Sequence, residues 1–181
     1  VMMAWFPGGQ WLAGTLETHD GLCRQMAHDL GIAVVCVQLA PASEGPLLQT
    51  CESAVLALRT LLEGRTKLGV QPHRMLVGGD GSGAHTAMQA AWRLARAQPG
   101  SVETVLSLCP LVKPDFNSAS YVRCASSPVL SRADAIRAWQ QFLQGRWDIW
   151  DERAVIMHGN APLQTTPVTV VIAAEQDVAH D

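Results

Sequence analysis

Short apolar runs that alternate with helical patterns are the feature that most constrains how this chain can fold. Five runs are interpreted as strands: Val1–Phe6, Ile32–Val37, Met75–Val77, Val105–Cys109 and Val168–Ala173. A strand that is apolar along its whole length is typical of a parallel sheet with both faces covered by helices. Because helical segments separate the runs, the sequence predicts βαβ units and a three-layer α/β fold.

The segments between these runs carry apolar residues at helical spacing. Helices are predicted at about Leu22–Leu30, Gln49–Glu63 and Ala84–Ala95. Ser131 to Asp134 resembles a capping box and predicts a further helix that runs to about Leu143, whereas residues 117–128 are predicted to be irregular. The 181 residues suit one domain, 1–181, with a helical insert at about 111–160.

Composition excludes several classes of protein. Hydrophobic residues make up 48% of the chain and charged residues only 16%, which is the opposite of a disordered chain. The net charge of −3 and the lack of a basic patch argue against a nucleic-acid partner. No uncharged apolar run approaches the ~20 residues that a membrane-spanning helix needs. None of the five cysteines forms a C-x-x-C pair, so neither a metal site nor a redox motif is predicted, and a reducing, cytoplasmic location is expected.

The glycine-rich segment Gly79-Asp80-Gly81-Ser82-Gly83 lies between a predicted strand and a predicted helix. This is the frame of a nucleophile elbow, a sharp strand-to-helix turn written G-x-S-x-G. Ligands of open parallel sheets bind at the carboxyl ends of the strands. The segments expected at that edge are Pro7–Gly9, residues 78–83, the stretch after Cys109, and Asp177.

Five motifs resemble, in order and spacing, the hormone-sensitive-lipase-like branch of the α/β-hydrolases. They are Pro7-Gly8-Gly9-Gln10-Trp11, Gly14–Asp20, Leu39-Ala40-Pro41, Gly79–Gly83 and Asp177–Asp181. That family reads His-Gly-Gly-Gly, Gly-Ser-Leu-Asp-Thr-His-Asp, Leu-Ala-Pro-Glu, Gly-Asp-Ser-Ala-Gly-Gly and Asp-Pro-Leu-x-Asp. The resemblance implies an α/β-hydrolase fold with a mostly parallel sheet, lacking edge strands at both ends. It also implies an ancestral activity on small acyl esters, without metal or cofactor.

The resemblance also implies roles for single residues. The N–H groups of Gly8 and Gly9, with that of Ser82, would form an oxyanion hole. Asp177 matches the acid of the catalytic triad, and the alternative is a plain loop carboxylate. Trp11 is the best candidate to line a substrate pocket, although aromatic residues on apolar faces more often serve packing.

The chain departs from the family where the chemistry takes place. Gly81 stands at the position of the nucleophilic serine, Pro7 replaces the histidine of His-Gly-Gly-Gly, Gln10 replaces its third glycine, and Ala42 replaces the glutamate of Leu-Ala-Pro-Glu. The family's catalytic histidine would lie a few tens of residues past Asp177, after which this chain has four residues. The resemblance therefore implies an esterase relative whose hydrolysis is lost or impaired.

Two other functions stay open at this point. The chain could be a non-catalytic small-molecule-binding protein on the same fold. It could also be an active esterase with a shifted elbow, Asp80-Gly81-Ser82-Gly83-Ala84, in which Ser82 is the nucleophile; otherwise Ser82 offers only its backbone N–H. His85 and His19 are predicted to be structural. The remaining histidines are predicted to lie in loops or at the surface: His28, His73, His158 and His180.

Overall fold

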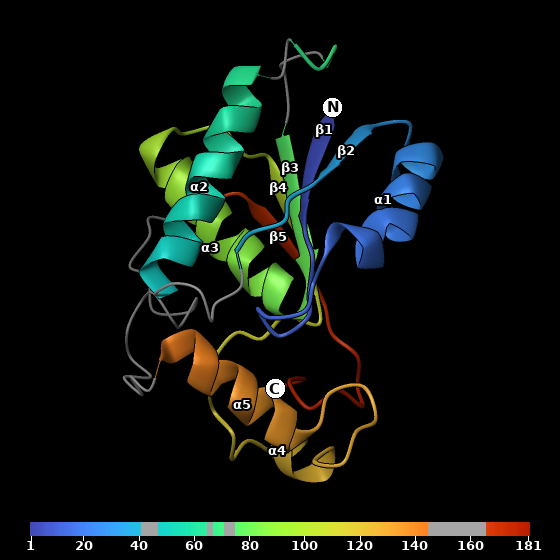
Figure 1. The fold of residues 1–181 in the computed structure, drawn as a ribbon, viewed down its shortest axis with the longest axis vertical. Coiled ribbons are helices and arrows are strands. Elements are labelled where there is room, and N and C mark those ends of the chain that lie inside the picture. The colour runs from blue at the N-terminus through green and yellow to red at the C-terminus, as the bar shows by residue number, and fades with distance from the viewer. Residues whose placement is uncertain (41–46, 65–66, 71–74, 145–165) are drawn as a thin grey trace.

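The computed structural model describes residues 1–40, 47–64, 67–70, 75–144 and 166–181. Strands and helices alternate through most of this part of the chain, as the sequence predicts (Figure 1). The elements are β1 (Met2–Phe6), α1 (Leu16–Leu30), β2 (Ala33–Cys36), α2 (Leu47–Gly64), β3 (Met75–Asp80), α3 (Gly81–Ala97), β4 (Thr104–Leu108), α4 (Ala119–Arg123), α5 (Arg132–Leu143) and β5 (Val168–Ile172).

The five strands form one parallel sheet in the order β2-β1-β3-β4-β5. Helices α2 and α3 cover one face and α1 lies on the other, while α4 and α5 lie beyond the carboxyl ends of the strands (Figure 1). The register pairs Phe6 with Gly79 and Asp80 with Leu108. The three central strands therefore end side by side, which places the segments that follow them at one edge of the sheet. This three-layer arrangement confirms the predicted α/β-hydrolase fold.

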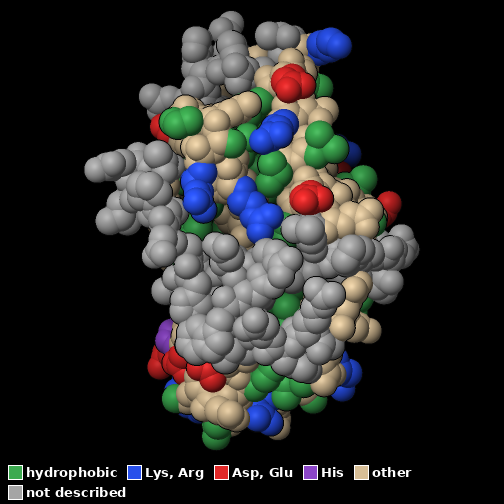
Figure 2. Space-filling model, turned by 90° about the vertical axis from the view of Figure 1, so that its left-hand side faces the viewer, with side chains coloured by type: hydrophobic (Ala, Val, Ile, Leu, Met, Phe, Trp, Pro, Cys, Tyr) green, Lys and Arg blue, Asp and Glu red, His purple; other side chains and the backbone are tan. Residues whose placement is uncertain are grey.

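The main core lies between the sheet and the helices α2 and α3. Small residues on the inner side of α3, such as Ala84, Ala87 and Ala91, are fully buried, so this helix packs close to the strands. Figure 2 shows the outer face of these helices, where Lys and Arg side chains gather. The basic residues of α2 and α3 are Arg59, Arg93 and Arg96, and all three are exposed or half-buried.

Two boundaries and one element differ from the sequence prediction. Helix α1 begins at Leu16, six residues before the predicted start, with Thr15 as its N-cap. Strand β3 continues through Gly78 and Gly79 to Asp80, so no loop separates it from α3. Glycine at position 78 leaves room for the Trp5 ring, because a Cβ built there would lie 2.8 Å from two of its ring atoms. Residues 117–128, predicted to be irregular, contain the helix α4, whose single turn is too short to produce a readable period.

Two helix ends carry local capping signals, and the capping box at the start of α5 was predicted from the sequence. Ser131 and Asp134 form the predicted capping box at the start of α5, and Gly31 ends α1 with a left-handed φ of 61°. The predicted insert contains α4 and α5, and its residues 145–160 lie outside the described part. All five cysteines are free thiols. Among the described helices, none has the length and apolar character that a bilayer crossing requires.

The edge strand β5 is expected to make the isolated 181-residue chain associate with itself. Val168, Val171 and Ile172 are 67%, 52% and 53% exposed, and such an apolar edge is a template for strand pairing. The other edge strand, β2, is half-buried because α1 packs against it. Light scattering at micromolar concentration should therefore show oligomers.

The substitutions Val168→Lys and Val171→Lys should shift that distribution towards monomer, because charged side chains block edge pairing. Val129→Lys is the matched control, since Val129 is 89% exposed but lies between α4 and α5. A monodisperse wild-type monomer would contradict this reading of the sheet edge.

Candidate active site

Gly81 forms the apex of the turn between β3 and α3. Asp80 has an extended backbone with a φ of −125°, Gly81 has a φ of +52°, and α3 begins directly at Gly81. A Cβ built on Gly81 would meet no atom within 4 Å. Position 81 therefore combines a left-handed backbone with open space, the two features that an elbow gives to its nucleophile.

The flanking glycines are required for a different reason. A Cβ at Gly79 would lie 2.6 Å from the Gly83 carbonyl group, and a Cβ at Gly83 would overlap the carbonyl oxygen of Phe6. These positions need glycine because backbone packs directly on backbone. The geometry of the five-residue turn thus places the apex at Gly81 and not at either neighbour.

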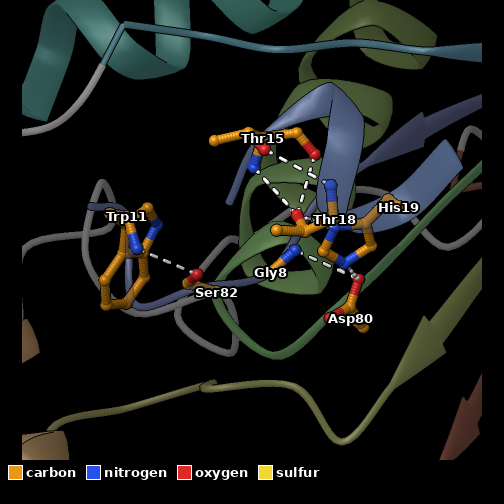
Figure 3. Close-up of polar contacts among 7 residues, drawn as sticks. All are labelled: Gly8, Trp11, Thr15, Thr18, His19, Asp80 and Ser82. Carbon is orange, nitrogen blue, oxygen red and sulfur yellow. Dashed lines mark hydrogen bonds and ion pairs between the residues drawn. The ribbon is translucent and has the colours of Figure 1, made fainter. Parts of the chain in front are cut away.

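Ser82 is turned away from solvent in the first turn of α3. Its residue exposure is 1%, and its Oγ accepts a hydrogen bond from the Trp11 N–H at 3.0 Å (Figure 3). A nucleophile must reach a substrate and hand its proton to a base. This buried hydroxyl holds the loop after β1 instead, which disfavours the shifted-elbow alternative.

The loop after β1, residues 7–11, is the segment from which the sequence predicts oxyanion-hole donors, and it is called the oxyanion loop below. Its Gly8 N–H donates to Asp80 Oδ1 at 3.0 Å, which differs from the prediction that this N–H faces a developing oxyanion. The next three residues, Gly9, Gln10 and Trp11, have φ values of 119°, 61° and 59°. The N–H groups of Gly9 and Gln10 have no partner among the described residues.

Gln10 is therefore a donor that the sequence reasoning missed. The signal was present, because Gln10 stands at the position of the third glycine of His-Gly-Gly-Gly. The Ser82 N–H belongs to the first turn of α3, where backbone donors have no partner within the helix. Among the described residues, Gly9, Gln10 and Ser82 are thus three whose backbone N–H groups have no hydrogen-bond partner.

Asp80 connects the oxyanion loop to helix α1. Its Oδ1 also lies 3.0 Å from Nε2 of His19, whose side chain is 14% exposed. The other ring nitrogen of His19, Nδ1, lies 2.8 Å from Thr18 Oγ1 (Figure 3). The predicted structural role of His19 agrees with these contacts, because both ring nitrogens are engaged by the protein.

Trp11 packs against two helices and also lines a cavity. Its ring stacks on Phe142 of α5 with centroids 4.0 Å apart, and its indole N–H donates to Thr86 Oγ1 at 3.3 Å. It also lines a cavity of about 120 Å³, together with Gly8, Ser82 and Leu39. The indole therefore ties the oxyanion loop to α3 and α5 while it forms part of a cavity wall.

His85, on the same helix as the elbow, is fully buried. Its Nδ1 donates to the Leu111 carbonyl at 2.7 Å, and its ring contacts Trp11, Trp139 and Phe142 edge-on. Burial lowers the pKa of His85 from 6.5 to about 4, although the bond to the Leu111 carbonyl raises it. The imidazole is neutral at pH 7 and enclosed, as expected for a structural histidine.

Asp177 lies on the loop that follows β5, at the carboxyl edge of the sheet. Its N–H donates to the Ala174 carbonyl at 3.0 Å, and its Oδ1 accepts from the Ala179 N–H at 2.7 Å. One carboxylate oxygen thus stabilises the loop itself. His180 is exposed, with Nδ1 3.1 Å from the Ala174 carbonyl oxygen, in line with the predicted loop position.

Ser120 of α4 holds this loop and was not singled out from the sequence. Its Oγ donates to the Val178 carbonyl at 2.8 Å, and its N–H donates to the Asp181 carboxylate at 2.6 Å. Burial, with a smaller effect of the Asp177 charge, raises the pKa of the neighbouring Tyr121 to about 12. Helix α4, which was not predicted from the sequence, therefore fixes the loop that carries Asp177.

The remaining candidates are placed as follows. His28 is exposed on α1 beside Asp29, whereas His73, His158 and Ala42 lie outside the described residues. In the described ranges no group of three or more His, Cys, Asp or Glu side chains could hold a metal ion.

A parallel five-stranded sheet with a glycine-framed turn after its central strand is the architecture of an α/β-hydrolase. The sequence matches the family described as alpha/beta hydrolase fold over residues 3–181. The chain belongs to this family.

Its relatives carry esterase names. Carboxylesterase NlhH of Mycobacterium tuberculosis is 32% identical over 187 residues, covering 99% of this chain and 57% of that protein. Ethyl acetate hydrolase of Pseudomonas putida is 27% identical over 175 residues, covering 96% and 55%. The crystal structure of a thermostable esterase from Pseudomonas putida ECU1011 shares the fold, with a TM-score of 0.90 and 24% identity over 99% of this chain and 56% of that one. The chain spans little more than half the length of these relatives.

Proposed function

We propose that the protein carrying this chain is an esterase-like α/β-hydrolase that binds a small acyl ester and whose serine-type hydrolysis is lost or impaired. The observation that carries the proposal is the apex at Gly81, with its left-handed backbone and open space but no hydroxyl group. The esterase names of the relatives support the ligand class. The position of Asp177 after β5 supports its assignment as the triad acid.

The chemistry follows from the atoms around Gly81. In a serine esterase, a serine oxygen attacks the ester carbonyl carbon, and backbone N–H groups stabilise the negative carbonyl oxygen. Here Gly9, Gln10 and Ser82 would supply those donors, so a carbonyl can be bound and polarised. Without an attacking oxygen at position 81, however, no acyl-enzyme forms. Removal of the nucleophile from a serine protease lowers kcat by roughly 10⁶.

Ester hydrolysis by the full-length protein should not exceed the rate in buffer. The assay uses p-nitrophenyl butyrate, and Ser82→Ala is the matched variant because it removes the only hydroxyl group within the turn of residues 79–83. We expect the same rate for the two proteins. A rate well above buffer that disappears in Ser82→Ala would establish Ser82 as the nucleophile and overturn the proposal.

The substitution Gly81→Ser should destabilise the protein without creating an active site in the 181-residue chain. The new side chain enters open space, so the penalty comes from the left-handed backbone alone, about 1–3 kcal/mol. The unfolding midpoint should fall. No phosphonate ester adduct should form on the new serine, because His19 already contacts Asp80 and Thr18, and His85 is enclosed.

Mass spectrometry after incubation with the phosphonate decides the second part. A stoichiometric adduct in the 181-residue chain would show that a base within it serves position 81. An adduct in the full-length variant alone would locate that base outside this chain. An unchanged or higher unfolding midpoint would show that position 81 is not a strained apex.

The second candidate function is a non-catalytic binding protein, and the cavity beside the oxyanion loop favours it. A ligand that binds only the folded state stabilises it by about 2.7 kcal/mol at a hundredfold excess over its Kd. A thermal-shift series with ethyl acetate, ethyl butyrate and their free acids separates the two candidates. Stabilisation by the esters would support the proposed ester site, whereas stabilisation by the free acids alone would favour a binding protein for another class of ligand. No stabilisation by any of these compounds would contradict both candidates.

A further inference from the structure

We propose that His19 is a positioning residue of the oxyanion loop: it fixes the Asp80 carboxylate, which in turn holds the loop through the Gly8 N–H. The contribution of this clamp to ligand binding rests on the proposed function. The clamp itself rests on the geometry at Asp80, where the loop after β1, the first turn of α1 and the end of β3 meet.

Asp80 Oδ1 receives both donors. Gly8 N–H donates to it at 3.0 Å, and His19 Nε2 approaches it at 3.0 Å from helix α1 (Figure 3). Gly8 is buried, and a Cβ on it would overlap Asp80 Oδ2, so the loop backbone packs directly on the carboxylate. A buried N–H requires a partner, and the orientation of Asp80 decides whether Gly8 has one.

The ring of His19 is itself held in one orientation. Its Nδ1 lies 2.8 Å from Thr18 Oγ1, and that oxygen accepts a hydrogen bond from the Thr15 N–H at 3.1 Å in the capping box of α1. The start of α1 thus determines the direction of His19, and His19 determines that of Asp80. This chain of contacts connects the helix on one face of the sheet to the turn at its carboxyl edge.

The clamp matters because the loop is also fixed at its other end. Ser82 Oγ accepts from the Trp11 N–H at 3.0 Å. Gln10, which lies between the fixed residues Gly8 and Trp11, and Trp11 itself have left-handed φ values. Such values are unfavourable for residues with side chains and persist only where surrounding contacts impose them. If Asp80 turns, this stretch can relax, and the N–H groups of Gly9 and Gln10 can change direction.

The first test measures amide hydrogen exchange of the Gly8 N–H in the full-length protein. His19→Leu keeps a similar volume and removes the donor, whereas His19→Gln retains an N–H that can reach Asp80. We expect exchange at Gly8 to be at least about tenfold faster in His19→Leu and near wild type in His19→Gln. His28→Leu, an exposed position on the same helix, is the matched control and should not change it. Unchanged exchange in His19→Leu, or equal acceleration in all three variants, would overturn the clamp.

The second test separates the clamp from the proposed function. Butyrate, an anion, probes the N–H donors, and ethyl butyrate, a neutral ester, probes the rest of the site. His19→Leu should weaken butyrate binding by about tenfold or more and ethyl butyrate binding by clearly less, because a charged oxygen depends more strongly on aligned donors than a neutral carbonyl oxygen. Equal weakening of both would assign His19 a purely structural role and overturn positioning. Faster Gly8 exchange in a protein that binds neither probe would keep the clamp and refute the ester site.

Discussion

Replacing Gly83 with alanine should destabilise the protein by about 3 kcal/mol or more, and at this size it can prevent folding altogether. The added Cβ would overlap the Phe6 carbonyl oxygen and lie 2.5 Å from that of Pro7. Both obstacles are backbone atoms at the end of β1, which cannot move without displacing the oxyanion loop. Urea denaturation of the full-length protein, followed by circular dichroism, measures the loss.

Gly21→Ala is the matched control for this prediction. Gly21 lies within α1, and a Cβ on it would meet no atom within 4 Å. Alanine is favoured over glycine inside a helix, so this variant should gain roughly 0.5–1 kcal/mol. If Gly83→Ala were as stable as wild type, the loop would not pack on the elbow, and the arrangement around Gly81 would have to be revised.

The fold could be predicted largely because its signals are local or periodic. The five strands are short apolar runs bounded by breaks, and their order with the helices implied a parallel sheet before any contact was known. Ser131 with Asp134 and Gly31 act within three or four residues of the helix ends that they define, so each could be read directly. The edge positions of β2 and β5 followed from the sheet that the resemblance implied.

The site could be predicted only to the level of segments. The family resemblance brought the loop at 7–11 and the turn at 79–83 together. It did not tell which N–H groups remain available, because that depends on side chains more than 70 positions away. Asp80 takes the N–H of Gly8 and Ser82 takes that of Trp11, over separations of 72 and 71 residues. No periodicity reports such pairings, since they depend on how β1 and β3 lie in register.

Ser82 shows how a local sequence motif and a long-range contact combine at one residue. The sequence left it as either a nucleophile or a provider of its backbone N–H. In the structure its hydroxyl has a third task, since it anchors Trp11 at a left-handed φ of 59°. Ser82 stands where the family has alanine, and its hydroxyl group stabilises a loop in which Gln10 replaces the family's third glycine. A sequence motif alone does not show that these two positions depend on each other.

Protein stability should fall by about 3 kcal/mol between neutral pH and pH 4 on account of His85 alone. Burial lowers the pKa of this imidazole to about 4 in the folded state, against an ordinary value of 6.5. Between these two values the unfolded chain binds a proton that the folded protein does not, so lowering the pH favours unfolding. The contribution is fully present above pH 6.5 and is lost as the pH falls towards 4. The difference between the two pKa values corresponds to about 3 kcal/mol.

The measurement compares urea unfolding of wild type and His85→Asn at pH values from 7 to 4. Asparagine keeps an N–H that can reach the Leu111 carbonyl but does not titrate, so its variant should have a flatter pH profile even if it is less stable at every pH. His28→Asn, at the exposed end of α1, is the matched control and should stay close to the wild-type profile, because that side chain is 84% exposed. Parallel profiles for wild type and His85→Asn would mean that the imidazole is not enclosed by Trp11, Trp139 and Phe142. In that case the packing that joins the oxyanion loop to α5 would also be wrong, since Trp11 belongs to both.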